Sequence, residues 1–136
     1  MRFPTLERDF WELRSGEGLH AESPTTFWIP PLEHRQRLPR GAGVKLVFDV
    51  QGVGDDGAAV IQRERMWVIV SEQRGDVYIG RLDNDPSVEP SPDTYLARGA
   101  EIPFRAEHVV DIQAPPGEYV EERLAGEPTR RWPPEW

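Results

Sequence analysis

A short phrase that occurs twice constrains the fold of this chain more than any other feature of its sequence. Residues 38–44 spell Leu-Pro-Arg-Gly-Ala-Gly-Val, and residues 96–102 spell Leu-Ala-Arg-Gly-Ala-Glu-Ile. Each copy leads into an apolar, β-favouring run, so that the glycine bends the backbone and the final Val or Ile begins a buried strand. We therefore expect Gly41 and Gly99 to lie in comparable turns, as in small β-barrels.

Further apolar runs predict the remaining strands. Residues 44–50 alternate in polarity, which indicates a half-buried strand. The most hydrophobic run, 66–70, predicts a central strand covered on both faces, and 77–82 predicts the strand that returns from it. Residues 102–104 and 109–112 predict two more, the first an edge strand or a bulge because it contains a proline. We expect one buried cluster to contain Val44, Leu46, Phe48, Met66, Val68, Val70, Ile79 and Phe104.

Two segments outside these runs predict helices. Residues 5–14 follow a helical spacing of apolar side chains, with Thr5 as the N-cap. Residues 118–125 end just before Gly126, which suits the C′ position of a helix. The predicted fold class is therefore mainly β (α+β). It is a small, strongly bent antiparallel sheet or partly open barrel of about five strands, with an N-terminal and a C-terminal helix.

The length of the chain predicts a single β-rich domain, residues 1–136. Within it, residues 1–24 form a helical N-terminal extension and residues 25–113 form the core. Residues 114–136 form a C-terminal helix and a tail rich in proline and tryptophan.

The tryptophans predict packing more than ligand binding. Trp67 lies in the central strand and is expected in the core, and Trp11 and Trp28 are expected to pack rather than to stack on a ligand. Trp132 and Trp136 are separated by two prolines and a glutamate. Such a tail either docks on a partner as a polyproline-type peptide or folds back over its own domain.

Composition excludes several functional classes. The chain has no cysteine, so disulfides, thiolate metal sites and cysteine nucleophiles are excluded. Its net charge is −8, and residues 64–113 hold ten acidic side chains against five Lys or Arg. An acidic surface repels phosphate backbones, so we predict no nucleic-acid binding, and a basic protein as the partner if there is one.

The sequence also predicts a cytoplasmic protein that does not bind membranes. No apolar stretch approaches the roughly 18 residues needed to span a bilayer. Residues 1–7 lack the apolar core of a signal peptide.

A cluster of acidic and amide side chains after the predicted strand 77–82 is the main candidate site. Asp83, Asn84 and Asp85 resemble the opening of a calcium loop, but the later Gly and the closing Glu are missing. We therefore predict a strand-end turn held by local backbone hydrogen bonds, with no metal and no cofactor. With Glu89 and Asp93 in the next loop, these residues form a candidate interaction site for a basic partner.

Catalytic motifs are lacking. His20, His34 and His108 match no metal-binding spacing, and His108 is expected at the entry to a strand. The alternative function is a small hydrolase or metal-dependent enzyme, with Asp83 or Asp85 paired to a histidine. That function requires the histidine within hydrogen-bond reach of a carboxylate inside a pocket.

The string Glu-Arg-Met-Trp-Val at 64–68 and the turn Asn-Asp-Pro at 84–86 resemble an uncharacterised bacterial family of domains of unknown function. The likeness spans residues 25–113. It implies a small β-rich module and brings no established activity, cofactor or catalytic residue. Some relatives resemble accessory or immunity-type proteins of bacterial toxin systems. The leading hypothesis is accordingly a non-enzymatic binding or accessory module, in its sharpest form an immunity-type protein that neutralises a basic toxin.

Overall fold

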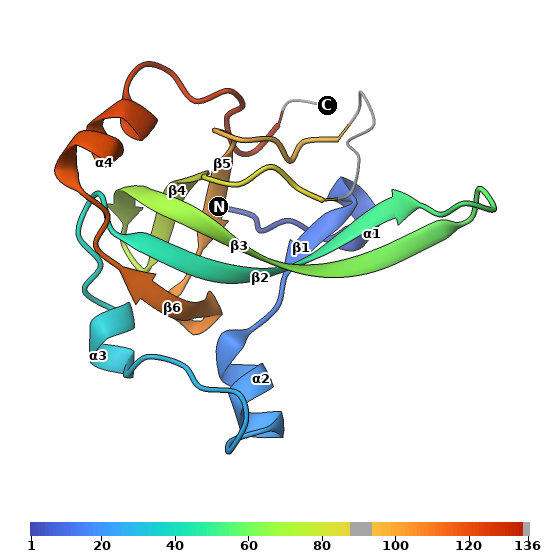
Figure 1. Ribbon diagram of the computed structural model, residues 1–136, viewed down its shortest axis with the longest axis horizontal. Helices are drawn as coiled ribbons and strands as arrows, with labels where there is room; N and C mark the ends of the chain where they lie inside the picture. Colours follow the sequence, from blue (N-terminus) through green and yellow to red (C-terminus); the bar gives the residue numbers. More distant parts are fainter. Residues whose placement is uncertain (88–93, 135–136) are drawn as a thin grey trace.

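The computed structural model describes residues 1–87 and 94–134, in which a curled antiparallel sheet dominates (Figure 1). Its strands are β1 (Trp11–Leu13), β2 (Gly43–Val53), β3 (Ala59–Arg74), β4 (Val77–Leu82), β5 (Glu101–Phe104) and β6 (Val109–Gln113). The helices are α1 (Leu6–Asp9), α2 (Gly16–Glu22), α3 (Leu32–Arg35) and α4 (Gly117–Leu124), with a 3₁₀ turn η1 (Ala106–His108). The predicted fold class is confirmed.

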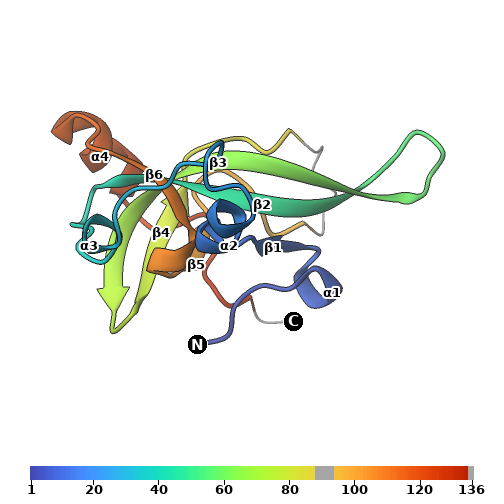
Figure 2. The same ribbon diagram turned by 90° about the horizontal axis from the view of Figure 1, so that it is seen from below.

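Strand β2 organises the sheet. The strand order is β1-β2-β3-β4-β5, and β6 also pairs with β2. β1 and β6 share one edge of β2, while β3 pairs with its whole length on the other edge. Irregular register between β2 and β6 and between β3 and β4 adds local twist to the sheet. The β2–β3 hairpin projects beyond the body of the molecule, at the end opposite α3 and α4 (Figure 2).

The repeated phrase forms two equivalent turns, as predicted. Gly41 and Gly99 have φ of 94° and 87°, and in each turn the following Ala N–H donates to the carbonyl three residues earlier, at 3.1 and 3.0 Å. The Gly41 N–H donates to the Val70 carbonyl at 2.8 Å, and the Gly99 N–H donates to the Leu82 carbonyl at 2.7 Å. The first turn is therefore hydrogen-bonded to β3, and the second to the end of β4. The residues that end the two phrases are fully buried: Val44 and Ile102.

Gly99 gives the first testable prediction. A Cβ on Gly99 would lie 2.9 Å from Thr129 Cγ2, and its positive φ strains any L side chain. We expect Gly99→Ala to lower the free energy of unfolding by about 1–3 kcal/mol in urea titrations. Gly57→Ala is the control, because Gly57 also has a positive φ but nothing within 4 Å of its Cβ position. Equal losses in the two variants would contradict the packing part of this account.

The predicted core is nearly complete. Seven of the eight expected residues lie in one cluster with Trp11, Tyr78 and Tyr95. Ile79 is buried but lies outside the cluster, because successive strand side chains alternate and its neighbour Tyr78 faces the core. Both faces of the central strand are covered, as predicted, since Ile69 is also buried.

The predicted helix over residues 5–14 is wrong in its extent. Thr5 caps α1 as expected, by accepting a hydrogen bond from the Arg8 N–H, but α1 ends after one turn at Phe10, whose φ is 67°. The chain then enters β1, where Trp11 pairs with Val50 and is completely buried. Burial of the indole in the core therefore outweighs the helical spacing of this segment. Trp67, expected in the core, is only half-buried.

The C-terminal segment closes the core. Trp132 is 5% exposed and packs edge-on against Trp11 and Tyr95, at centroid distances of 5.5 and 5.2 Å. Its Nε1 donates to the Arg2 carbonyl at 2.9 Å, and its backbone N–H donates to Glu101 Oε1 at 3.0 Å. At Trp132 the tail therefore folds back over its own domain.

The C-terminal helix agrees with its prediction, since α4 is followed by Gly126 with a φ of 69°. In the part of the chain that the structure describes, no helix is long and apolar enough to cross a membrane.

Candidate functional site

The predicted turn after β4 is present, but its bonds differ from those expected. Asn84 Oδ1 accepts the Trp67 N–H at 2.5 Å, and the Asp83 N–H donates to the Trp67 carbonyl at 2.8 Å. The Asn84 side chain thus takes the place that the next residue of β4 would occupy beside β3. The turn ends the strand, as predicted, through bonds to the neighbouring strand.

The two carboxylates of this turn bind side chains, which corrects the prediction of local backbone bonds. Asp83 Oδ2 accepts a hydrogen bond from the Tyr119 hydroxyl at 2.5 Å, and Asp83 Oδ1 lies 3.5 Å from both Arg98 and Arg123. Asp85 lies 3.4 Å from Arg98. The hydrogen bond to Asp83 raises the pKa of Tyr119 above its ordinary value. These contacts fasten α4 to the end of the sheet.

The cleft beside Asp83 lacks the geometry that the enzyme alternative requires. It has a volume of about 260 Å³, and its lining includes Arg81, Arg98 and Arg123 but no histidine among the described residues. Elsewhere, His108 Nδ1 accepts the Arg105 N–H at 2.9 Å, at the entry to β6. Within residues 1–87 and 94–134, no group of three or more His, Asp or Glu could hold a metal ion.

The carboxylates in and around the candidate interaction site are largely bound by other groups of the same chain. Each described carboxylate between residues 72 and 101 has an intramolecular partner: Glu72 with Arg74, Asp76 with Arg105, Asp83 with Arg98 and Arg123, Asp85 with Arg98, and Glu101 with the Trp132 N–H. The other two members of the predicted interaction site, Glu89 and Asp93, lie outside the described residues.

A groove of about 690 Å³ lies between β6 and the segment that leads into α3. Its apolar lining consists of Trp28, Pro30, Pro31, Leu38, Pro39 and Ile112. Trp28 is 67% exposed, so most of its side chain does not pack against the protein as expected. Charged and polar side chains also line the groove: Glu33, His34, Arg37 and Asp111. Among the residues that the structure describes, Glu33 and Asp111 form no ion pair, in contrast to the carboxylates after β4.

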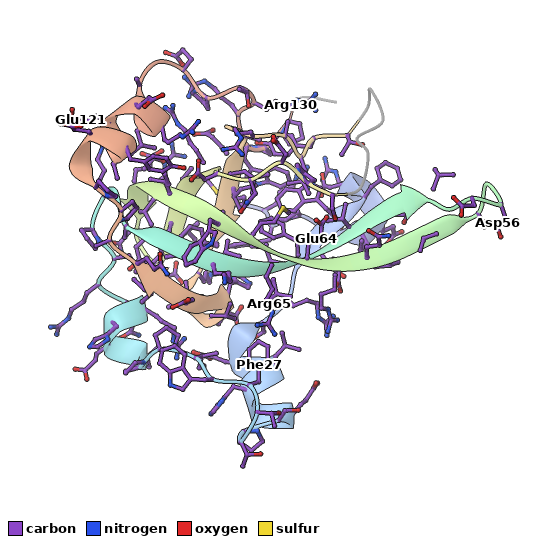
Figure 3. The ribbon with its side chains drawn as sticks, in the orientation of Figure 1. Phe27, Asp56, Glu64, Arg65, Glu121 and Arg130 are labelled. Atoms are coloured by element: carbon purple, nitrogen blue, oxygen red, sulfur yellow. The ribbon has the colours of Figure 1, made fainter. Side chains whose placement is uncertain are left out.

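The wall that carries Trp28 is firmly anchored. Arg35 is 4% exposed, and its guanidinium donates to the carbonyls of Pro30 and Ala106, each at 2.8 Å. Beside Trp28, Arg65 reaches from β3 over the Phe27 ring, at 5.0 Å from its centroid (Figure 3). The same guanidinium also pairs with Glu17 Oε2 at 2.7 Å. Nothing in the sequence pattern marks Arg35 as buried, because two of its partners are backbone carbonyls and the third, Glu17, is distant in the sequence. A preformed wall lowers the entropic cost of binding a ligand.

Comparison with known proteins adds no relative. A scan against protein-family models, a search of curated proteins and a search of solved structures each found no match for this chain. The resemblance to an uncharacterised bacterial family therefore stays a prediction, and any functional proposal depends on the chain's own geometry.

Proposed function

We propose that this protein is a non-enzymatic binding module that holds a segment of a partner protein in the groove between α3 and β6. The observation that carries the proposal is the exposure of Trp28 on an anchored wall, beside a groove of about 690 Å³. Large aromatic side chains supply much of the binding energy at protein interfaces. The alternative function is an enzyme that uses Asp83 or Asp85. It is disfavoured because these carboxylates are already engaged in ion pairs with arginine and, for Asp83, in a hydrogen bond with Tyr119.

We further propose that the partner is basic. The chain has a net charge of −8, and the groove is lined by Glu33 and Asp111, two carboxylates that form no ion pair with any described residue. Arg37 also lines it, so a ligand with a cation near Asp111 fits better than a uniformly basic one. In its sharpest form the module is a bacterial, cytoplasmic immunity-type protein that neutralises a basic toxin.

Selection from a phage-displayed library of random peptides tests this proposal. We expect the wild-type protein to enrich peptides that contain Arg or Lys together with apolar residues. Their affinity for Trp28→Ala should fall about tenfold or more, since a central interface aromatic contributes at least about 1.4 kcal/mol.

Val53→Ala is the matched control, because Val53 is also exposed but lies at the end of β2, away from the groove. It should bind like wild type. Enriched peptides that bind Trp28→Ala as well as wild type, or a library that yields no enrichment, would contradict the proposed function.

A further inference from the structure

The outer edge of β6 is only partly covered. In the described part of the chain, β6 pairs with β2 alone. Gly16 of α2 packs tightly on η1 and the start of β6, since a Cβ there would lie 3.4 Å from the His108 carbonyl and 2.8 Å from Val110 Cγ1. The end of the strand, from Asp111 onward, borders the groove instead.

In an antiparallel strand, the N–H and carbonyl of successive residues point alternately to the two sides. This alternation determines which backbone groups of β6 point away from β2. The Val70 N–H donates to the Ala42 carbonyl, so Val70 faces β2. Because the direction of the N–H and carbonyl alternates along an antiparallel strand, the backbone groups of Val68 also point toward β2, where they bond those of its register partner Val44. The backbone groups of Val44 therefore point toward β3. Its register partner on β6 is Ile112, whose N–H and carbonyl consequently point away from β2.

In the described part of the chain, the hydrogen bond made by the Ile112 N–H is to a neighbouring side chain. Asp111 Oδ1 accepts it at 2.8 Å. Asp111 and Ile112 both line the groove, although successive side chains of a strand point to opposite faces. The groove therefore runs along the strand edge itself, and the Asp111 carboxylate stands where the carbonyl of an added strand would be.

We propose that the partner segment binds as an additional antiparallel strand on the outer edge of β6, a mode that rests on the proposed function of the groove. Main-chain bonds to Ile112 supply affinity in this mode, and alternate side chains supply specificity. Cross-strand neighbours share a face of the sheet, so the ligand residue opposite Ile112 is apolar and the one opposite Asp111 is basic. The ligand thus alternates apolar and basic residues. On binding, a carbonyl of the ligand accepts the Ile112 N–H in place of Asp111, and the Asp111 carboxylate pairs with the cation of the ligand.

A synthetic octapeptide of alternating valine and arginine, acetylated and amidated, is the probe for this mode. Calorimetric titration should show binding to wild-type protein with a Kd below about 1 mM. N-methylation of the valines, whose N–H groups face β6, should weaken binding about tenfold or more. N-methylation of the arginines, whose N–H groups face away from β6, should change the Kd by less than about threefold.

A charge test accompanies the backbone test. Asp111→Asn keeps an acceptor for the Ile112 N–H and removes the charge. It should weaken the arginine probe and leave a valine–glutamine probe unaffected, while the melting temperature of the protein is preserved.

The outcomes separate the two proposals. Equal effects of the two N-methylated sets, or no binding of the probe, would overturn strand addition. If peptides from the library still lose affinity for Trp28→Ala in that case, the groove remains the binding site and only the mode is wrong. If they do not, the proposed function itself fails.

Discussion

Trp132→Ala should lower the free energy of unfolding by about 3–5 kcal/mol, the usual cost of removing a buried aromatic side chain. The substitution empties a space between Trp11 and Tyr95 and removes the hydrogen bond to the Arg2 carbonyl. It also removes the ring over which the Arg2 guanidinium lies, at 4.6 Å from the centroid. The expected loss is therefore the largest among the variants considered.

Urea denaturation followed by circular dichroism measures this loss. Trp28→Ala is the matched control, because it deletes the same side chain at a position that is 67% exposed, and its effect should stay within about 0.5 kcal/mol. Trp132→Phe should fall between the two, since it restores part of the packing without the indole N–H. A Trp132→Ala protein as stable as Trp28→Ala would show that the tail does not close the core.

Acidification should destabilise the protein through His108. Burial, with the nearby charge of Arg105, lowers the pKa of His108 from 6.5 to about 4 in the folded state. Between these values the histidine is protonated in the unfolded chain and neutral in the folded protein. The free energy of unfolding is therefore at its full value above pH 6.5 and falls as the pH drops toward 4. The lowered pKa corresponds to a loss of about 3 kcal/mol across this window.

His108→Asn isolates this contribution. The asparagine side-chain oxygen can accept the Arg105 N–H in place of His108 Nδ1, and it does not titrate. Unfolding free energies measured at pH 7 and at pH 4 should therefore fall by about 3 kcal/mol more for wild type than for the variant. Parallel declines would mean that His108 is protonated as readily in the folded state as in the unfolded chain.

The features that the sequence predicted well depend on local chemistry. The turns at Gly41 and Gly99 were identifiable because glycine, which has no Cβ, adopts a positive φ at little cost. The strand end at Asn84 was likewise predictable, since amide side chains often replace backbone partners in turns.

The features that the sequence did not predict depend on distant partners. The helix expected over residues 5–14 fails because Trp11 pairs with Val50, about forty positions away in the sequence. The carboxylate of Asp83 meets Tyr119 and Arg123 only after α4 has docked. The groove was missed for the same reason, since its walls come from the segment before α3 and from β6.

Amide chemical-shift mapping with the alternating valine–arginine octapeptide tests the central claim most directly. The claim is that the groove between α3 and β6 is the binding site. It predicts that the largest shifts occur at the Trp28 indole and at the Asp111 and Ile112 amides, with little change at Asp83 and Arg98. Shifts centred on the cleft that Asp83 and Arg98 line would contradict it.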